Sequence, residues 1–305
     1  MSKMWRCIKN GTYTPRSIER QQIDLFPENS YTSHKTFISG DDMLSGMSTK
    51  SHIEWTEFTW NPATGCTKIS PGCKHCYAKI MAERLQAMKA PGYENGFKLT
   101  LHPDRITQPL SRKKPTVYFV NSMSDLFHEG IPDDFLDKVF ETISKTPRHT
   151  YQILTKRPEQ MEEYFCSRLV PDNAWLGVSV EDKKYGLPRI DILRRVNAKI
   201  RFLSIEPLLE NLGQFDLSGI HWVIVGGESG AKARQMKAEW VDPIIQQCQD
   251  ADVAFFFKQW GMWGEDGVKR SKAANGRLFQ GKLWDGVPKL DTPTEEIKQR
   301  QLSLI

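Results

Sequence analysis

Seven short apolar runs recur between residues 58 and 257, and each is followed by a cluster of polar residues. They are FTWN (58–61), TVYFV (116–120), YQIL (151–154), AWLGVSV (174–180), IRFL (200–203), HWVIV (221–225) and VAFFF (253–257). Such runs are typical of buried parallel strands. Amphipathic segments lie between them, for example DDFLDKVFETISK with Phe135, Val139 and Ile143 at helical spacing. Strands that alternate with helices predict an α/β fold with a parallel sheet.

The polar clusters distinguish between two forms of such a sheet. A doubly wound sheet gathers its ligand groups near one switch point, whereas a (β/α) barrel draws them from the C-terminal ends of several strands. Polar residues follow all seven apolar runs of this chain. We therefore expect a partial or near-complete (β/α) barrel of about six to seven parallel strands, with a functional site at the C-terminal ends of the strands.

The 305-residue chain divides into three parts by composition. Residues 1–50 show little periodicity and are expected to form a loosely ordered extension. Residues 51–262 carry the barrel pattern, and residues 263–305 are expected to form a C-terminal tail or cap. No apolar run approaches the ~18 residues that span a bilayer, and the N-terminus lacks a signal-peptide core. These features predict a cytoplasmic protein with no membrane partner.

Three of the six cysteines, Cys66, Cys73 and Cys76, lie close together in the sequence. So few cysteines in so tight a cluster indicate metal or redox chemistry in a reducing compartment. Pro71 and Gly72 predict a sharp turn that folds Cys66 back towards the C-x-x-C pair. The following sequence, YAKIMAERLQAMK, is a strong helix former. The cysteines are therefore expected in a loop that enters a helix N-terminus, which suits thiolates or an anionic cluster.

The residues alone leave three types of cysteine site open. A structural zinc site needs four ligands, and His75 or a distant histidine would have to supply the fourth. A [4Fe–4S] cluster normally takes four cysteines, so three would leave one iron open for a substrate or cosubstrate. A disulfide with one spare thiol is the third alternative, but nothing in the sequence indicates an oxidising compartment.

The stretch IEWTEFTWNPATGCTKISPGCKHCYA resembles the cysteine loop of the radical SAM superfamily. Within that superfamily it is similar to an often phage-borne family that carries a three-cysteine motif. The resemblance runs from about residue 51 to about residue 262 and includes NSMSDLFHE, LTKRPEQM, LGVSVED, FLSIEPLLE, WVIVGGESG and FFKQWG. Two features depart from the usual superfamily pattern. The cysteine spacing is C-x6-C-x2-C, and the Gly-Gly-Glu sequence follows the sixth strand instead of the second.

The resemblance implies a defined cofactor chemistry. Cys66, Cys73 and Cys76 would each bind one iron of a [4Fe–4S] cluster, and S-adenosylmethionine would chelate the fourth iron. An external one-electron reductant such as flavodoxin or ferredoxin would supply the electron that cleaves S-adenosylmethionine to methionine and a 5′-deoxyadenosyl radical. That radical would act on a substrate that the sequence does not identify. His75 would then pack beside the cluster and would not ligate it.

The polar residues after the second and third strands are candidate contacts for S-adenosylmethionine. Asp125 is the favoured partner for its amino group, although the same residue would also suit a helix N-cap. Lys156, with its neighbours Thr155 and Arg157, could meet the carboxylate, although a solvated basic turn would have the same sequence. The complete second-strand set is Asn121, Ser122, Ser124 and Asp125.

Two carboxylates follow the fourth and fifth strands at matching offsets, and either could bind a ribose diol. Buried carboxylates are costly unless they are paired, and Lys156 and Lys258 are the expected partners. A glycine pair after the sixth strand could let the backbone approach a ligand closely. These candidates are Ser179 with Glu181, Ser204 with Glu206, and Gly226 and Gly227 with Glu228.

Nucleic acid is a possible substrate or partner, because the net charge of +5 permits a polyanion. Basic stretches at 112–114 and 269–272, with Trp55, Trp60 and Trp263 near the expected barrel mouth, could receive it. The alternatives to an enzyme are a non-catalytic zinc- or cluster-binding protein and a nucleic-acid-binding module that uses the metal site only for structure. Trp260 could stack on a base, but a core position is the simpler expectation.

Overall fold

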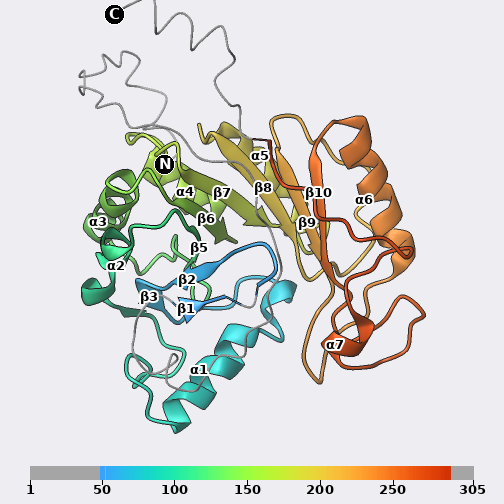
Figure 1. Ribbon diagram of the computed structural model, residues 1–305, viewed down its shortest axis with the longest axis horizontal. Helices are drawn as coiled ribbons and strands as arrows, with labels where there is room; N and C mark the ends of the chain where they lie inside the picture. Colours follow the sequence, from blue (N-terminus) through green and yellow to red (C-terminus); the bar gives the residue numbers. More distant parts are fainter. Residues whose placement is uncertain (1–48, 52, 290–305) are drawn as a thin grey trace, which may run out of the picture.

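The computed structural model describes residues 49–51 and 53–289, and its central element is an eight-stranded sheet (Figure 1). The strand order is β1-β2-β5-β6-β7-β8-β9-β10. Only β1 (Thr49–Lys50) is antiparallel, where it pairs with β2 (Phe58–Trp60). The parallel strands that follow are β5 (Val117–Val120), β6 (Thr150–Thr155), β7 (Ala174–Ser179), β8 (Ile200–Ile205), β9 (Trp222–Gly226) and β10 (Ala254–Gln259). All seven expected strands are therefore confirmed, in one parallel array.

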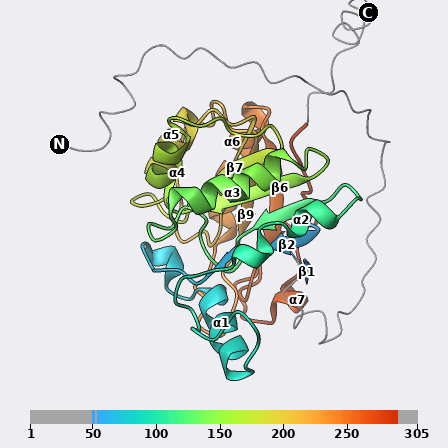
Figure 2. The same ribbon diagram turned by 90° about the vertical axis from the view of Figure 1, so that its left-hand side faces the viewer.

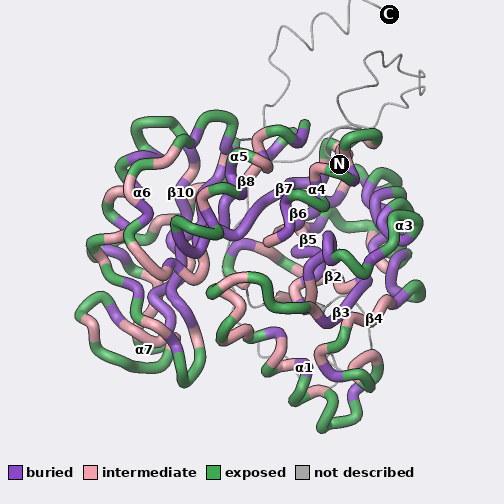
Figure 3. Tube along the Cα trace, turned by 180° about the vertical axis from the view of Figure 1, so that it is seen from behind, coloured by how far each residue is buried: buried purple, intermediate pink, exposed green. Residues whose placement is uncertain are grey.

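Helices cover one face of this sheet, which we call the outer face (Figure 2). They are α3 (Asp133–Ser144), α4 (Pro158–Phe165), α5 (Leu187–Arg195) and α6 (Ala238–Asp250). Phe135, Val139 and Ile143 are buried on α3, as their spacing predicted. They belong to a core that also holds alternate strand residues, such as Ile153 and Leu176. Figure 3 shows this contrast between buried strands and helices with one exposed side.

The other face of the sheet, the inner face, carries no such helices and changes character along the strands. Its N-terminal half is an aromatic cluster centred on Trp222, which contacts the rings of Trp55, Trp175, Phe202 and Phe256 at centroid distances of 5.9–6.1 Å. Because successive side chains alternate between faces, the same rows continue towards the C-terminal ends. There they are polar: Ser179 on β7, Ser204 and Glu206 after Phe202 on β8, and Lys258 on β10. The inner face is therefore filled by aromatic side chains at its N-terminal end and is polar at its C-terminal end.

The sheet is an open, partial barrel, and an antiparallel segment covers each edge. β1 pairs with β2 at one edge. At the other edge, Phe257 N donates to Trp284 O at 2.9 Å and Gly286 N donates to Phe255 O at 2.9 Å. Covered edges lack the unpaired backbone groups that promote aggregation. A complete barrel is not formed within residues 49–51 and 53–289.

The domain boundaries stay a prediction for most of the terminal segments. β1 falls inside the stretch that we expected to be a loosely ordered extension. Residues 1–48 and 290–305 lie outside the described part of the chain. In the part that is described, no helix has the length and apolar character that crossing a bilayer requires.

Smaller elements position the segment after β2. β3 (Ala63–Thr64) pairs with β4 (Thr100–Leu101) in a separate two-stranded sheet. The remaining elements are η3 (Pro71–Cys73), α1 (Tyr77–Ala87), η4 (Pro103–Arg105), α2 (Gln108–Ser111) and α7 (Lys272–Asn275). Ala78 and Ala82 of α1 pack with Met123 in the loop after β5.

The contact between Gly177 and Phe202 gives a test of the inner face. A Cβ atom at Gly177 would lie 2.5 Å from the Phe202 ring. Gly177→Ala should therefore lower the free energy of unfolding by about 1–3 kcal/mol through overpacking, as measured by urea denaturation. In a Phe202→Leu background the same substitution should cost clearly less, because the side chain in its path is smaller. An equal loss of unfolding free energy in both backgrounds would contradict the assigned contact between Gly177 and Phe202.

Candidate functional site

The three clustered cysteines lie in the segment that joins β2 to α1, at the C-terminal ends of the strands (Figure 1). Cys73 ends η3, which is the sharp turn that Pro71 and Gly72 predicted. Cys76 is the N-cap residue of α1. All three thiols are free and half-buried, and the Cys73 thiolate contributes to raising the pKa of Cys66. The expected loop between a strand and a helix N-terminus is confirmed. We call residues 66–76 the cysteine loop.

Arg157, after β6, holds the start of the cysteine loop. Its side chain is only 4% exposed, and every one of its N–H groups has an acceptor. Nη1 lies 3.4 Å from Cys66 Sγ and 3.2 Å from Asp125 Oδ2. Nη2 donates to Thr67 O at 3.1 Å and to Thr67 Oγ1 at 2.7 Å, and Nε donates to Glu129 Oε2 at 2.8 Å. Arg157 is therefore neither part of a solvated turn nor free to bind a ligand.

Asp125 joins the loop after β5 to the end of β6. Its Oδ1 accepts from Thr155 Oγ1 at 2.7 Å and from Phe127 N at 3.1 Å, and its Oδ2 accepts from Lys156 N at 2.9 Å and from Arg157. The bond to Phe127 N is an Asx turn. The next helix, α3, has Pro132 as its N-cap, so the helix N-cap alternative for Asp125 is wrong. The carboxylate already has four hydrogen bonds, and its contact with S-adenosylmethionine stays a prediction that the geometry does not favour.

Glu181, which follows β7, supports the middle of the cysteine loop. It is fully buried, accepts from Ser70 Oγ at 2.6 Å and is also bonded to Arg189. Lys156 Nζ lies 3.7 Å away, so the expected pairing with Lys156 is confirmed. Burial raises the pKa of Glu181, but Lys156, Arg189 and Ser70 together hold it below its usual value. A Cβ atom at Gly72 would lie 2.3 Å from Oε1, so the loop can rest on this carboxylate only with glycine there.

The Gly-Gly-Glu sequence after β9 reaches the loop through an arginine. Glu228 is buried and accepts from the backbone N and the Nε of Arg234, both at 2.8 Å. Burial raises the pKa of Glu228, but the hydrogen bonds from Arg234 outweigh that effect and lower it. Arg234 Nη1 then donates to Pro71 O at 3.0 Å. A Cβ atom at Gly227 would lie 2.0 Å from Trp260 O, so this glycine allows close approach to neighbouring backbone.

A second group of predicted residues gathers on the inner face, at the ends of β8, β9 and β10. Lys258 Nζ lies 3.0 and 2.8 Å from the two oxygens of Glu206, which confirms the expected pair. Gln259 Nε2 also donates to Glu206 at 3.3 Å, and Gly226 lies against the same carboxylate. The Lys156, Glu206 and Lys258 side chains remain 22%, 20% and 14% exposed. A ligand could reach these three, unlike the fully buried Glu181.

The residues after β5 support the chain that precedes Cys66. Asn121 Oδ1 accepts from Ala63 N at 3.4 Å, and Ser124 Oγ donates to Ala63 O at 2.9 Å. Ser122 Oγ donates to Asn61 Oδ1 at 3.1 Å. Asn121 has a φ of 56°, a left-handed conformation that asparagine tolerates better than most residues. These three residues lie beside the loop but are engaged in holding it.

Two of the three tryptophans expected near the mouth are buried elsewhere. Trp55 belongs to the aromatic cluster at the N-terminal half of the inner face. Trp60 is buried in the core on the outer face of the sheet, where its Nε1 donates to Arg105 O at 2.8 Å. Trp263 is half-buried and donates to Ala233 O at 2.8 Å. Trp260 is a core residue, as the simpler expectation held, and stacks on Phe279.

The environments of Cys66 and Cys73 differ. Burial and the nearby Asp125 carboxylate raise the pKa of the Cys66 thiol to about 11, although Arg157 acts against them. Burial also raises the pKa of Cys73, but the charge of Lys156 and hydrogen bonds from the Ile69 and Ser70 backbones outweigh it, so the net pKa is lowered.

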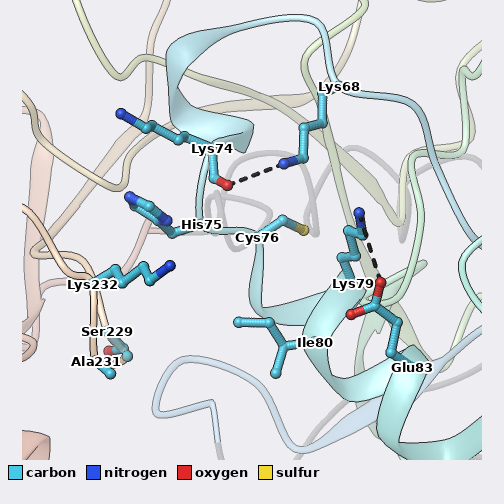
Figure 4. A pocket seen from close by; sticks show the side chains of 11 residues that line it. Lys68, Lys74, His75, Cys76, Lys79, Ile80, Glu83, Ser229, Ala231 and Lys232 are labelled. Atoms are coloured by element: carbon cyan, nitrogen blue, oxygen red, sulfur yellow. Dashed lines mark hydrogen bonds and ion pairs between the residues drawn. The ribbon is translucent and has the colours of Figure 1, made fainter.

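A cavity of about 390 Å³ lies between the cysteine loop, α1 and residues 229–232 (Figure 4). Within it the His75 imidazole and the Cys76 sulfur point to opposite sides of the backbone (Figure 4). His75 is therefore not oriented to share a metal ion with Cys76. In the described part of the chain, no three His, Cys, Asp or Glu side chains converge where one metal ion could bind.

Sequence reasoning missed most of the side chains that hold the loop. They are Thr67, Ser70, Glu129, Arg189 and Arg234. Arg234 donates to Pro71 across 163 positions of sequence, and Ser70 donates to Glu181 across 111. No local pattern signals contacts of that range. Gly72, which the sequence explained only as part of a turn, was the one available hint of a close neighbour.

Arg157→Lys tests the hold on the start of the loop. Lysine keeps the charge but lacks the planar fork that reaches Thr67 and Cys66 together. The free energy of unfolding should fall by about 2 kcal/mol. Backbone amides of residues 66–70 should exchange hydrogen faster in metal-free protein, as measured by mass spectrometry. Arg195→Lys, at a more exposed ion pair with Glu162, is the control and should leave that exchange unchanged. Unchanged hydrogen exchange in Arg157→Lys would contradict the assignment of Arg157 as the residue that holds the start of the loop.

Comparison with solved structures finds only low similarity. A variant of spore photoproduct lyase gives a TM-score of 0.44 at 12% identity over 71% of this chain and 80% of that chain. Spore photoproduct lyase complexed with dinucleoside spore photoproduct gives 0.40 at 15% identity, over 67% of this chain and 64% of that chain. The chain thus spans less than two thirds of the latter protein, and likeness at this level carries no inference about activity.

No curated protein matches the sequence. One family model does match, over residues 50–288, which include every strand of the parallel sheet and the whole cysteine loop. The chain belongs to the family described as "Protein of unknown function (DUF5131)".

Proposed function

We propose that this chain is a radical SAM enzyme whose cysteine loop holds a [4Fe–4S] cluster through Cys66, Cys73 and Cys76. When bound, the cluster supplies the electron that cleaves S-adenosylmethionine to methionine and a 5′-deoxyadenosyl radical, which then abstracts hydrogen from a substrate. The observation that carries the proposal is the preformed loop of three free, half-buried thiols at the C-terminal ends of the strands.

The donor set fits an anionic iron–sulfur cluster. Hydrogen bonds to cluster sulfurs and nearby positive charge tune such centres, and this loop already receives both. Arg157 donates towards Cys66 at 3.4 Å, and Lys156 lowers the pKa of Cys73.

The geometry favours a cluster over a zinc ion. Zinc needs four ligands on one tetrahedron, whereas a [4Fe–4S] cluster spreads its thiolates over separate irons. His75 points away from the Cys76 sulfur (Figure 4). The described residues offer no convergent group of three ligands for one ion. A cluster with three protein ligands therefore suits this loop better.

The partly exposed residues of the inner face are the best candidates to bind S-adenosylmethionine. Lys156 and Lys258 could meet its carboxylate, and Glu206 could accept hydrogen bonds from its ribose or amino group. Glu181, Asp125 and Glu228 would act indirectly, because they are buried and already hydrogen-bonded. The aromatic cluster below this band closes the N-terminal end, which would help exclude water from the reaction. The proposal also requires an external one-electron reductant, such as flavodoxin or ferredoxin.

Anaerobic reconstitution tests the proposal directly. The loaded protein should be brown and contain about four irons per chain. With S-adenosylmethionine and dithionite it should release 5′-deoxyadenosine, measured by chromatography. Cys76→Ala should lose both properties, whereas Cys248→Ala should keep them, because Cys248 is buried on α6 away from the loop.

The opposite result is equally specific. A colourless protein with one zinc per chain and no 5′-deoxyadenosine would overturn the proposal and favour a non-catalytic zinc protein.

A further inference from the structure

The cavity beside the cysteine loop is strongly basic. Four lysines line it, Lys68, Lys74, Lys79 and Lys232, against a single carboxylate from Glu83 (Figure 4). Glu83 pairs with Lys79, at 3.6 Å. Lys68 donates to the backbone oxygen of Lys74, which neutralises no charge. The cavity therefore keeps an excess of positive charge, unlike the paired charges beneath the loop.

The far wall of the cavity adds backbone donors. Residues 229–232 form an irregular turn in which Gly230 has a φ of 102°. Among residues 49–51 and 53–289, no acceptor receives a hydrogen bond from the backbone N–H groups of these four residues. Unused backbone N–H groups next to ammonium groups form a typical environment for phosphate oxygens.

We propose that this basic groove binds the phosphates of a nucleic-acid strand. Lysine is a regular phosphate ligand, and protein–nucleic acid interfaces are much more positively charged than protein–protein interfaces. Lysine is depleted at protein–protein interfaces, so four lysines around a concavity fit an acidic protein partner less well. Cys76 lines the same groove, so a bound strand would lie beside the proposed cluster.

Binding of a strand needs no cluster. The inference that nucleic acid is the substrate class rests on the proposed function. The experiment therefore uses the full-length metal-free protein first and the reconstituted protein second. Fluorescence anisotropy with a labelled single-stranded DNA oligonucleotide and an RNA of the same sequence gives Kd at several salt concentrations. Two competitors are used: a mononucleotide, and a polyglutamate with the same net charge as the oligonucleotide.

The test variant is Lys79→Gln with Lys232→Gln, which leaves the cysteine loop unchanged. The control is Lys138→Gln with Lys145→Gln, an equal loss of charge at exposed positions on and directly after α3, on the outer face of the sheet. For a single strand, each phosphate contact contributes about 0.7 to the slope of log K against log salt. The test variant should therefore show a slope shallower by about 1.4 and roughly tenfold weaker binding at low salt. The control should bind like the unsubstituted protein.

Four results would overturn the inference. The first two are no binding of either strand at low salt and equal binding by the test and control variants. The third is competition by polyglutamate as strong as by unlabelled oligonucleotide, which would indicate an acidic protein partner. Strong competition by the mononucleotide would likewise replace a strand with a small phosphate ligand. If the protein forms no cluster but still binds the oligonucleotide, the proposed function is rejected and the inference that the groove binds phosphates stands.

Discussion

The hydrogen bonds of one buried guanidinium fix the start of the cysteine loop, and the other contacts of the site build on that anchor. Arg157 connects the end of β6 to Cys66, to Thr67 and to the Asp125 carboxylate. Burying such charges costs several kcal/mol per ion unless each has partners, and here every donor is used. The loop is thus held in place by the protein itself, through strand ends that the parallel sheet brings together.

The two faces of the sheet divide stability from chemistry. The outer face and its helices form the larger apolar core, while the inner face passes from aromatic to polar along the strands. Buried carboxylates such as Glu181 support the loop, and the more accessible Glu206 and Lys258 remain within reach of a ligand. Placing the site on strand ends gives it a rigid base, whereas the neighbouring basic groove keeps unpaired charge for a partner.

The fold could be predicted further than the site. Apolar runs identified all seven parallel strands and helical spacing identified α3, because burial on one or both faces leaves a periodic record in sequence. The pairs of Lys156 with Glu181 and Lys258 with Glu206 were also predictable, since each set follows a strand and the parallel array brings strand ends together. Trp55 was misplaced because composition does not reveal which end of the barrel an aromatic residue closes.

The sequence by itself determined the parallel α/β array, the turn at Pro71 and Gly72, and the position of the three clustered cysteines before α1. Only the tertiary structure decided that Arg157 is buried against Cys66 and that Arg234 reaches Pro71. The physical reason is that periodic burial is a local property of the chain, whereas the partner of a buried charge is whichever group the fold brings near enough to offset its desolvation.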